Sequence, residues 1–194
     1  MAEAWGDVPL VSHEVQPEGW VLLAVPDAAI PAMADRFRGR CVHLSGSLEL
    51  KGVPSAHPLT SFNGTASDWV GTPLALTGEV PAFLVARFEA LGFCPFSLRA
   101  ELKSLYHAAA VLTSGHAATL WLGARHLLDE GGVALPGRGL MALAEATLRN
   151  VEARGVEGRT GPFVRGDEDT IARDAAALPE PWREIFVRLG RTDV

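Results

Sequence analysis

The sequence has few of the features that mark secreted, metal-binding or nucleic-acid-binding proteins. It has two cysteines, Cys41 and Cys94, at no spacing typical of a zinc site or a disulfide framework. No positively charged stretch followed by an apolar run opens the chain, so no signal peptide is predicted. Acidic residues outnumber basic ones by 23 to 17, which argues against a partner held through phosphate contacts. We therefore expect a cytoplasmic protein with reduced, buried cysteines, no metal and no nucleic-acid partner.

One long uncharged stretch, residues 105–124, needs a separate explanation. It contains His107, Thr113, Ser114 and His116, which are costly in contact with lipid. We interpret this stretch as a helix buried among other helices, and no membrane partner is predicted.

The first half of the chain alternates apolar runs with turn residues and helical patterns, as expected for an α/β domain. Four runs are predicted as strands, at residues 20–25, 41–44, 72–76 and 93–98. Residues 28–38 are predicted as a helix with Asp27 as its N-cap, and residues 80–91 as an amphipathic helix. The continuous apolar run at 20–25 is typical of a parallel strand buried on both faces.

The second half is rich in alanine and leucine and is predicted to be entirely helical. A long helix is expected over residues 99–130, then helices at 136–153, after Asp167 and from Pro181. Small residues between 108 and 118 would let a second backbone approach closely. The sequence therefore predicts an α/β domain at 1–98 and an all-helical domain at 99–194.

Lys103, His107 and Ser114 are the polar residues of the long helix with the spacing of a site. Lys103 and His107 are four residues apart, so both project from one face, and Ser114 follows close to the same stripe. A desolvated lysine has a lowered pKa, as acid–base work at neutral pH requires. The alternative is a solvated Lys103 and a hydrogen-bonded core His107.

Two segments of the first half offer further polar groups. Ser45 and Gly46 follow a predicted strand and could present backbone N–H groups to a carboxylate, or they could form a plain turn. His57 precedes Pro58 and is therefore extended, lining a cleft or bonding to loop carbonyls.

Six short motifs occur in an order that resembles one bacterial family. They are Val25-Pro26-Asp27, His43-x-Ser45-Gly46, His57-Pro58-Leu59-x-Ser61-Phe62, Lys103-x-x-Tyr106-His107-Ala108-Ala109, Thr147-Leu148-x-Asn150-Val151 and Thr160-Gly161-Pro162-x-x-Arg165-Gly166-Asp167. Together they resemble the Rossmann-like proteins with an uncharacterised helical C-terminal domain, often labelled NADP oxidoreductases of the deazaflavin-dependent type. That family is distantly similar to the 6-phosphogluconate dehydrogenase and ketopantoate reductase group.

The resemblance implies a Rossmann-like parallel sheet, an NADP or NAD cofactor and a homodimer formed by the helical domain. It implies that Lys103 donates a proton to the substrate and that His107 orients the substrate oxygen. The residues implied to bind a small-molecule substrate are Ser45, Gly46, His57, Ser61, Ser114, Asn150 and Arg165.

Some of these roles have plain alternatives. Val25, Pro26 and Asp27 would form the rim of the cofactor site. Asn150 could instead bond a loop backbone, and Arg165 could pair with Asp167 to shape its loop.

The sequence departs from the family pattern at two places. No Gly-x-Gly-x-x-Gly turn occurs before Trp20, whereas family members begin with such a turn to hold the cofactor pyrophosphate. A misplaced gene start, a natural truncation and an excised fragment would each explain this. Gly115 also follows Ser114 where the family usually has an asparagine. The sequence thus predicts a truncated Rossmann-like NAD(P)-dependent oxidoreductase acting on a small carbonyl or imine, or else a non-catalytic, dimeric binding or scaffold remnant of that family.

Overall fold

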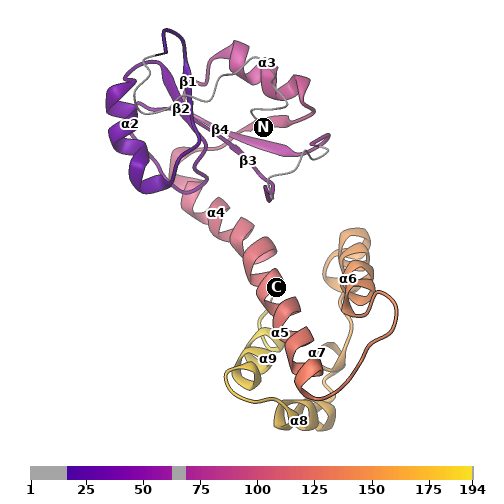
Figure 1. Ribbon diagram of the computed structural model, residues 1–194. Coiled ribbons are helices and arrows are strands. Elements are labelled where there is room, and N and C mark those ends of the chain that lie inside the picture. The colour runs from indigo at the N-terminus through magenta and orange to yellow at the C-terminus, as the bar shows by residue number, and fades with distance from the viewer. Residues whose placement is uncertain (1–16, 63–68, 194) are drawn as a thin grey trace. The chain divides into compact units, whose positions relative to one another are not determined.

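The computed structural model describes residues 17–62 and 69–193, which belong to two compact units (Figure 1). The first unit is Met1–Leu120 and the second is Trp121–Val194. The predicted boundary lies between residues 98 and 99, whereas this division falls between Leu120 and Trp121, within the long helical stretch. Lys103, at the start of that stretch, donates hydrogen bonds to Ser45 and Ser55 of the first unit.

A five-stranded sheet is the centre of the first unit. Its strands are β1 (Val21–Leu23), β2 (Cys41–His43), β3 (Ser55–Pro58), β4 (Pro73–Thr77) and β5 (Cys94–Ser97). They lie side by side in sequence order, and every neighbouring pair is parallel except β3 and β4, which are antiparallel. The α/β class is confirmed, while the sheet expected to be parallel is mixed.

Strand β3 was not predicted from the sequence, and neither were the short helical segments η4 (Gly155–Gly158) and α7 (Pro162–Arg165). The residues of β3 read Ser-Ala-His-Pro, with no run of β-branched or aromatic side chains, and proline is normally confined to strand edges and ends. Pro58 lies at its last position, and β3 pairs with β4 over four residues and with β2 through His43 and Ser55. Pairing with neighbours, rather than local propensity, makes this segment a strand.

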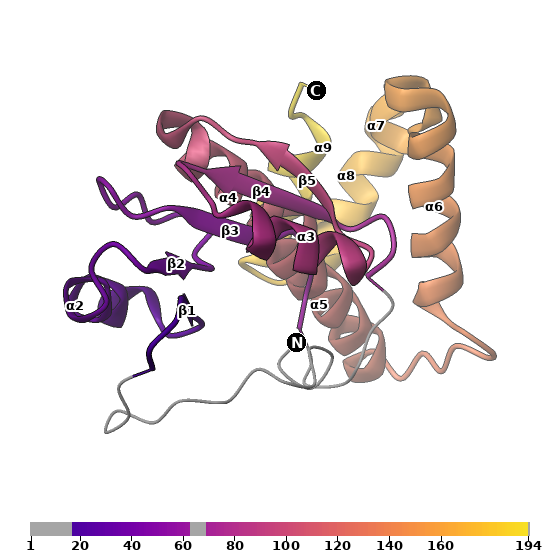
Figure 2. The same ribbon diagram turned by 90° about the horizontal axis from the view of Figure 1, so that it is seen from above.

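Two hydrophobic clusters cover opposite faces of the sheet. Helix α3 (Ala82–Ala90) places Leu84 and Phe88 in one cluster with Val42 of β2. Helix α2 (Ile30–Arg36) packs in the other cluster, which contains Cys41. Because side chains alternate along a strand, Val42 and Cys41 face opposite ways, so α3 and α2 cover different faces. Figure 2 shows α3 across β3, β4 and β5, and α2 beside β1 and β2.

Cys94 differs from the prediction that both cysteines are buried. Cys41 is buried and Cys94 is exposed, because Cys94 belongs to β5, the last strand of the sheet.

The segment predicted to begin with an N-cap at Asp27 has another arrangement. Residues Asp27–Ala29 form a 3₁₀ turn (η1), and α2 starts only at Ile30. The Asp27 carboxylate makes no capping bond; it accepts hydrogen bonds from the hydroxyls of Ser45 and Ser47 instead. This carboxylate therefore joins the loop after β1 to the loop after β2.

The long helical stretch predicted from residue 99 to 130 is confirmed, but residues 105–124 are not buried among other helices as expected, because most of their side chains are exposed or half-buried. The stretch consists of a 3₁₀ turn η2 (Ala100–Leu102), α4 (Lys103–Val111), a π-helical segment η3 (Leu112–His116) and α5 (Ala117–Glu130). Thr113 and Ser114 donate their hydroxyls to carbonyls four residues back, and such bonds compete with the regular helical ladder. Short π-helical segments inside α-helices occur frequently at functional sites.

The described part of the second unit is helical. Beyond α5 it contains α6 (Leu140–Arg154), η4 (Gly155–Gly158), α7 (Pro162–Arg165), α8 (Glu168–Ala177) and α9 (Trp182–Gly190). The predicted cap at Asp167 is confirmed, because its carboxylate accepts from the Thr170 amide at 3.1 Å. A Cβ added at Gly123 would lie 2.0 Å from the Trp182 ring, so glycine permits this close helix contact. No helix in the described ranges is long and apolar enough to span a bilayer.

Candidate active site

The turn at Ser45 and Gly46 is the point where the predicted site residues of the first unit converge. It follows directly after β2, and both residues are buried. Lys103 contacts Ser45, whereas His57 and His107 contact Gly46. Ligands of open α/β sheets commonly bind at loops that follow strands, so this turn is the structural centre of the candidate site.

Lys103 is buried behind the turn, with 2% of its surface exposed. Its Nζ donates hydrogen bonds to the Ser45 carbonyl oxygen at 3.0 Å and to Ser55 Oγ at 2.5 Å. Burial lowers the pKa of Lys103 to about 8, and the negative charges of Asp27 and Glu49 oppose this shift. The predicted desolvated lysine is therefore present, rather than the solvated alternative.

A network of hydroxyls and one carboxylate holds the other end of the turn. Ser45 Oγ donates to Asp27 at 2.8 Å and accepts from the Leu48 amide at 2.9 Å. Ser47 donates to the same carboxylate at 3.1 Å. The backbone of the turn is thus held by Lys103 and its side chains by Asp27.

His57, Tyr106 and His107 lie on the Gly46 side of the turn. His57 Nδ1 and the Tyr106 hydroxyl are 3.0 Å apart, and the rings of His57 and His107 have centroids 6.2 Å apart. A Cβ added at Gly46 would lie 2.8 Å from both His107 Cδ2 and His57 Nε2. Only glycine therefore lets the backbone pass this close to the two imidazoles.

Burial shifts the protonation of His57 and Tyr106 toward their neutral forms. Burial, followed by the positive charge of His107, lowers the pKa of His57 to about 4. Burial raises the pKa of Tyr106 above its ordinary value of 10. At neutral pH, His57 and Tyr106 are therefore an uncharged pair that can share a proton in a hydrogen bond.

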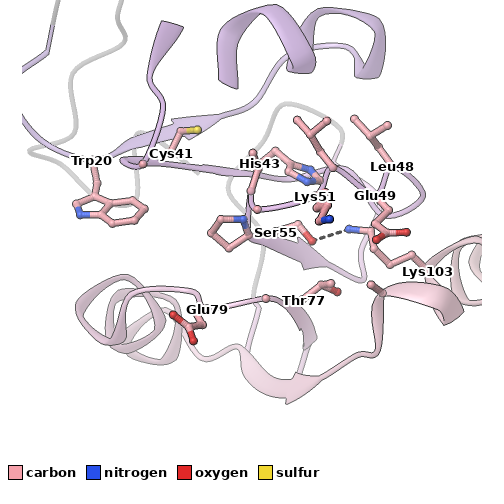
Figure 3. Close-up of a pocket in the computed structure, with 17 residues that line it drawn as sticks. Trp20, Cys41, His43, Leu48, Glu49, Lys51, Ser55, Thr77, Glu79 and Lys103 are labelled. Atoms are coloured by element: carbon pink, nitrogen blue, oxygen red, sulfur yellow. Dashed lines mark hydrogen bonds between the residues drawn. The ribbon is translucent and has the colours of Figure 1, made fainter. Parts of the chain in front are cut away.

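Two cavities flank the turn within the first unit. The first, here the Lys103 cavity, has a volume of about 480 Å³ and is lined by His43, Ser55 and Lys103 among others (Figure 3). The second, here the His107 cavity, has a volume of about 440 Å³ and is lined by His57, Tyr106 and His107. The expectation that Lys103 and His107 face one cleft is corrected, because the turn contacts both residues and each lines a different cavity.

The remaining predicted site residues lie in three places: the His107 cavity, the loop after β1 and the second unit. Ser61 and Ser114 line the His107 cavity, although the Ser114 hydroxyl also donates to Ala110 O at 2.7 Å. Val25 packs on the apolar cluster beneath α2, and Pro26 is exposed.

Asn150 and Arg165 lie in α6 and α7 of the second unit. A Cβ at Gly158 would lie 2.2 Å from the Asn150 carbonyl oxygen, so this part of α6 packs tightly on the turn that follows it. Substrate contacts of both residues stay predictions.

Sequence reasoning did not assign functions to Ser55, Tyr106 or His43. Tyr106 belongs to the same sequence motif as Lys103 and His107, so the sequence could have indicated it as a site residue. Ser55 belongs to the unpredicted strand β3, and nothing local indicated that it would meet Lys103. His43 is 1% exposed, and its Nδ1 has no hydrogen-bond partner within residues 17–62 and 69–193.

The described residues offer little to a metal ion or to a cofactor pyrophosphate. Within residues 17–62 and 69–193, no group of three or more His, Cys, Asp or Glu side chains could hold a metal. Gly137-x-Gly139-x-x-Ala142 opens α6, but no strand leads into it as the dinucleotide motif requires. The carboxylate of Asp27 is already bonded to Ser45 and Ser47. The described loops after β1 and β2 contain no Gly-x-Gly-x-x-Gly turn.

Comparison with known proteins places this geometry in a family. The family described as domain of unknown function DUF2520 matches residues 72–192, more than half of the sequence. The chain belongs to this family. The DUF2520 segment contains Lys103, Tyr106 and His107, whereas Asp27, the Ser45–Gly46 turn and His57 precede it.

Two solved structures have a similar fold. A proposed NADP oxidoreductase from Bacteroides fragilis, BF3122, has a TM-score of 0.76 and 21% identity, with 92% of this chain and 76% of that chain covered. Protein TM1727 from Thermotoga maritima has a TM-score of 0.72 and 23% identity, with 92% and 78% covered. No curated protein matches the sequence. At these identities, the two solved structures bear on the fold of this DUF2520 protein alone.

Proposed function

We propose that this DUF2520 protein is an NAD(P)-linked oxidoreductase that reduces a small carbonyl or imine compound in the His107 cavity. The observation that carries the proposal is the close approach of the Gly46 backbone to His57 and His107 beside this cavity. Two imidazoles and a phenol at one partly enclosed site can donate and accept protons, as reduction of a carbonyl requires. The name of the Bacteroides fragilis relative is consistent with this chemistry.

In this proposal, His107 delivers the proton to the substrate oxygen or nitrogen. An imidazole suits this step because its ring nitrogens can both donate and accept a proton. The neutral pair of His57 and Tyr106 orients the same atom by hydrogen bonding. The nicotinamide cofactor, when bound, supplies the hydride.

The sequence assigned proton donation to Lys103, and we transfer it to His107. The Lys103 amine is bonded to Ser45 O and Ser55 Oγ and lines the other cavity. In the proposed reaction, Lys103 positions the turn against which His57 and His107 rest. A nearby loop at residues 25–27 provides the rim of the cofactor site.

The non-catalytic, dimeric alternative has a separate observation in its favour. Helix α6 has no buried residue, and Met141, Leu143, Leu148 and Val151 on it are exposed. Unpaired apolar side chains on a helix are typical of an interface with another chain. We propose that a second copy of the chain covers them, and a homodimer of this kind is compatible with either function.

The test of the oxidoreductase proposal separates cofactor binding from proton delivery. NADPH fluorescence is titrated against the wild-type protein and His107→Gln, followed by assays of NADPH oxidation with small aldehydes, 2-keto acids and cyclic imines. We expect saturable binding to both proteins and a loss of about a hundredfold or more in kcat for His107→Gln, within the range typical of a general acid. Thr119→Ala, on α5 and outside the cavity lining, serves as the control.

The outcome also separates the two functions. Absence of NADPH binding up to millimolar concentration would contradict the oxidoreductase proposal for this chain. Sedimentation of the same sample as a 20.6 kDa monomer at micromolar concentration would contradict the homodimer.

A further inference from the structure

The Lys103 cavity has no part in the proposed reduction, yet it has the structure of a binding site. Its innermost polar groups are His43, Ser55 and Lys103, of which 1%, 1% and 2% are exposed. Figure 3 shows the Lys103 amine directed at Ser55 and the His43 ring on the same side of the cavity. Buried polar groups around a cavity of this size are typical of sites that bind small molecules.

The hydrogen bonds of Lys103 leave its amine ready to act as a nucleophile. A neutral amine has two N–H groups and one lone pair, and two acceptors, Ser45 O and Ser55 Oγ, lie within bonding distance. Loss of the third proton therefore breaks neither of these bonds and frees the lone pair. A pKa of about 8 means that roughly a quarter of the amine is neutral at pH 7.5, against about a thousandth for an ordinary lysine.

His43 adds an uncharged hydrogen-bond acceptor to the lining of the Lys103 cavity. Its Nδ1 is buried and has no partner among the described residues, and such an atom normally finds a ligand or a water to bond. Burial, followed by the positive charge of Lys103, lowers the pKa of His43 to about 4, so the ring is neutral at physiological pH. A neutral imidazole that lines the same cavity can accept a hydrogen bond from a bound molecule.

The rest of the lining indicates which carbonyl compounds the cavity would take. The exposed rim carries two carboxylates, of Glu49 and Glu79, against one amine, of Lys51, so an anionic compound is disfavoured there. The walls are mainly apolar and include Leu48, Val53 and the side chain of Trp20. An uncharged aldehyde with an aliphatic or aromatic body fits these surroundings better than a keto acid or a sugar phosphate.

We propose that the Lys103 cavity binds small uncharged aldehydes and that the Lys103 amine captures them as an imine. The ammonium first releases a proton, and the nitrogen lone pair then forms a bond to the carbonyl carbon while the oxygen takes up that proton. A second proton transfer, from nitrogen to the hydroxyl, releases water and leaves a C=N bond. The sum is one ammonium and one aldehyde giving one protonated imine and one water, with no change of oxidation state. The iminium N–H remains available to Ser45 O.

The composition of the chain makes this proposal simple to test. The sequence has two lysines, Lys51 and Lys103, and Lys51 is an exposed residue on the rim of the same cavity. The folded protein is treated with butanal and sodium cyanoborohydride at pH 7.5, and peptide mapping by mass spectrometry measures N-butyl groups on each lysine. We expect initial labelling of Lys103 to exceed that of Lys51 by about tenfold or more, because of the larger neutral fraction.

Two variants sharpen the result. Lys103→Arg keeps a cation but has no nucleophilic amine, and it should lose the fast labelling, while the matched variant Lys51→Arg should retain it. The proposal is overturned if Lys51 and the N-terminal amine react while Lys103 does not, or if Lys103 reacts no faster than Lys51. The wild-type ratio decides the question even if Lys103→Arg does not fold. Because this labelling needs no nicotinamide cofactor, its outcome is independent of the oxidoreductase proposal.

Discussion

The two sides of the Ser45–Gly46 turn meet different residues of the same helix. On one side, the buried Lys103 amine lines the Lys103 cavity and donates hydrogen bonds to Ser45 O and Ser55 Oγ. On the other side, His107 lies one helical turn later, in a cavity with His57 and Tyr106. Residues four apart on a helix share a face, yet Lys103 and His107 line different cavities and meet different residues of the Ser45–Gly46 turn. Helical spacing alone therefore does not establish that two side chains form one site.

Substitution of Gly46 should have the largest effect, because its backbone passes close to the rings of both His57 and His107. The added Cβ in Gly46→Ala would meet His57 and His107 at 2.8 Å and displace both rings. We expect a loss of about a hundredfold in any reductase activity and about 1–3 kcal/mol in stability. Steady-state kinetics and urea unfolding measure the two effects.

Gly115→Ala is the matched control for this substitution. Gly115 lies in the π-helical segment, and no atom lies within 4 Å of a Cβ added there. Equal losses for the two alanine variants would contradict the importance of the close approach at Gly46.

Because of Lys103, the free energy of unfolding should change at alkaline pH. The pKa of Lys103 is about 8 in the folded protein and 10.5 in the unfolded chain, so between these values the unfolded state binds more protons. Stability should therefore rise with pH, by about 2 kcal/mol between pH 8 and 9.5. Urea unfolding at several pH values should show this rise in the wild type and in Lys51→Met, and should not show it in Lys103→Met.

His43 should make the Lys103 side sensitive to acid as well. Its pKa is about 4 in the folded protein against an ordinary 6.5, so the unfolded state binds more protons in this window, and stability falls as pH drops below 6.5. The loss due to this ring is about 1–2 kcal/mol between pH 6.5 and 5. His43→Leu should remove that part of the fall and leave stability at pH 7.5 nearly unchanged. An unaltered acid profile in His43→Leu would show that this ring is not held neutral.

Substitution of Tyr106 should have a smaller effect than the substitutions of Gly46, Lys103 and His43. Tyr106→Phe removes the hydroxyl bonded to His57 Nδ1, at a cost of about 1 kcal/mol in unfolding free energy. Because the sequence has a single tyrosine, phenolate absorbance reports this residue alone. Its titration in the folded protein should lie above pH 10, and an ordinary midpoint would contradict the burial of this group.

Periodicity and composition predicted most of the elements. Strands β1, β2, β4 and β5, helix α3 and the long helix to Glu130 lie close to their predicted positions, because apolar runs and turn residues are local signals. Strand β3 was not predicted because it is stabilised by pairing with β2 and β4 rather than by a local sequence pattern. The hydrogen bonds that the Asp27 carboxylate accepts were not predicted for a similar reason, since their donors Ser45 and Ser47 are distant in the sequence.

The sequence by itself determined the α/β class, the helical second half and the residue types of the candidate site. Hydrophobic spacing acts over a few residues, so it can be read without knowing the fold. Only the tertiary structure decided that Ser55 would meet Lys103, that Gly46 would leave room for two imidazoles, and that two cavities would form instead of one. These features depend on contacts between segments far apart along the chain, whose geometry is set by sheet register and close packing rather than by local pattern.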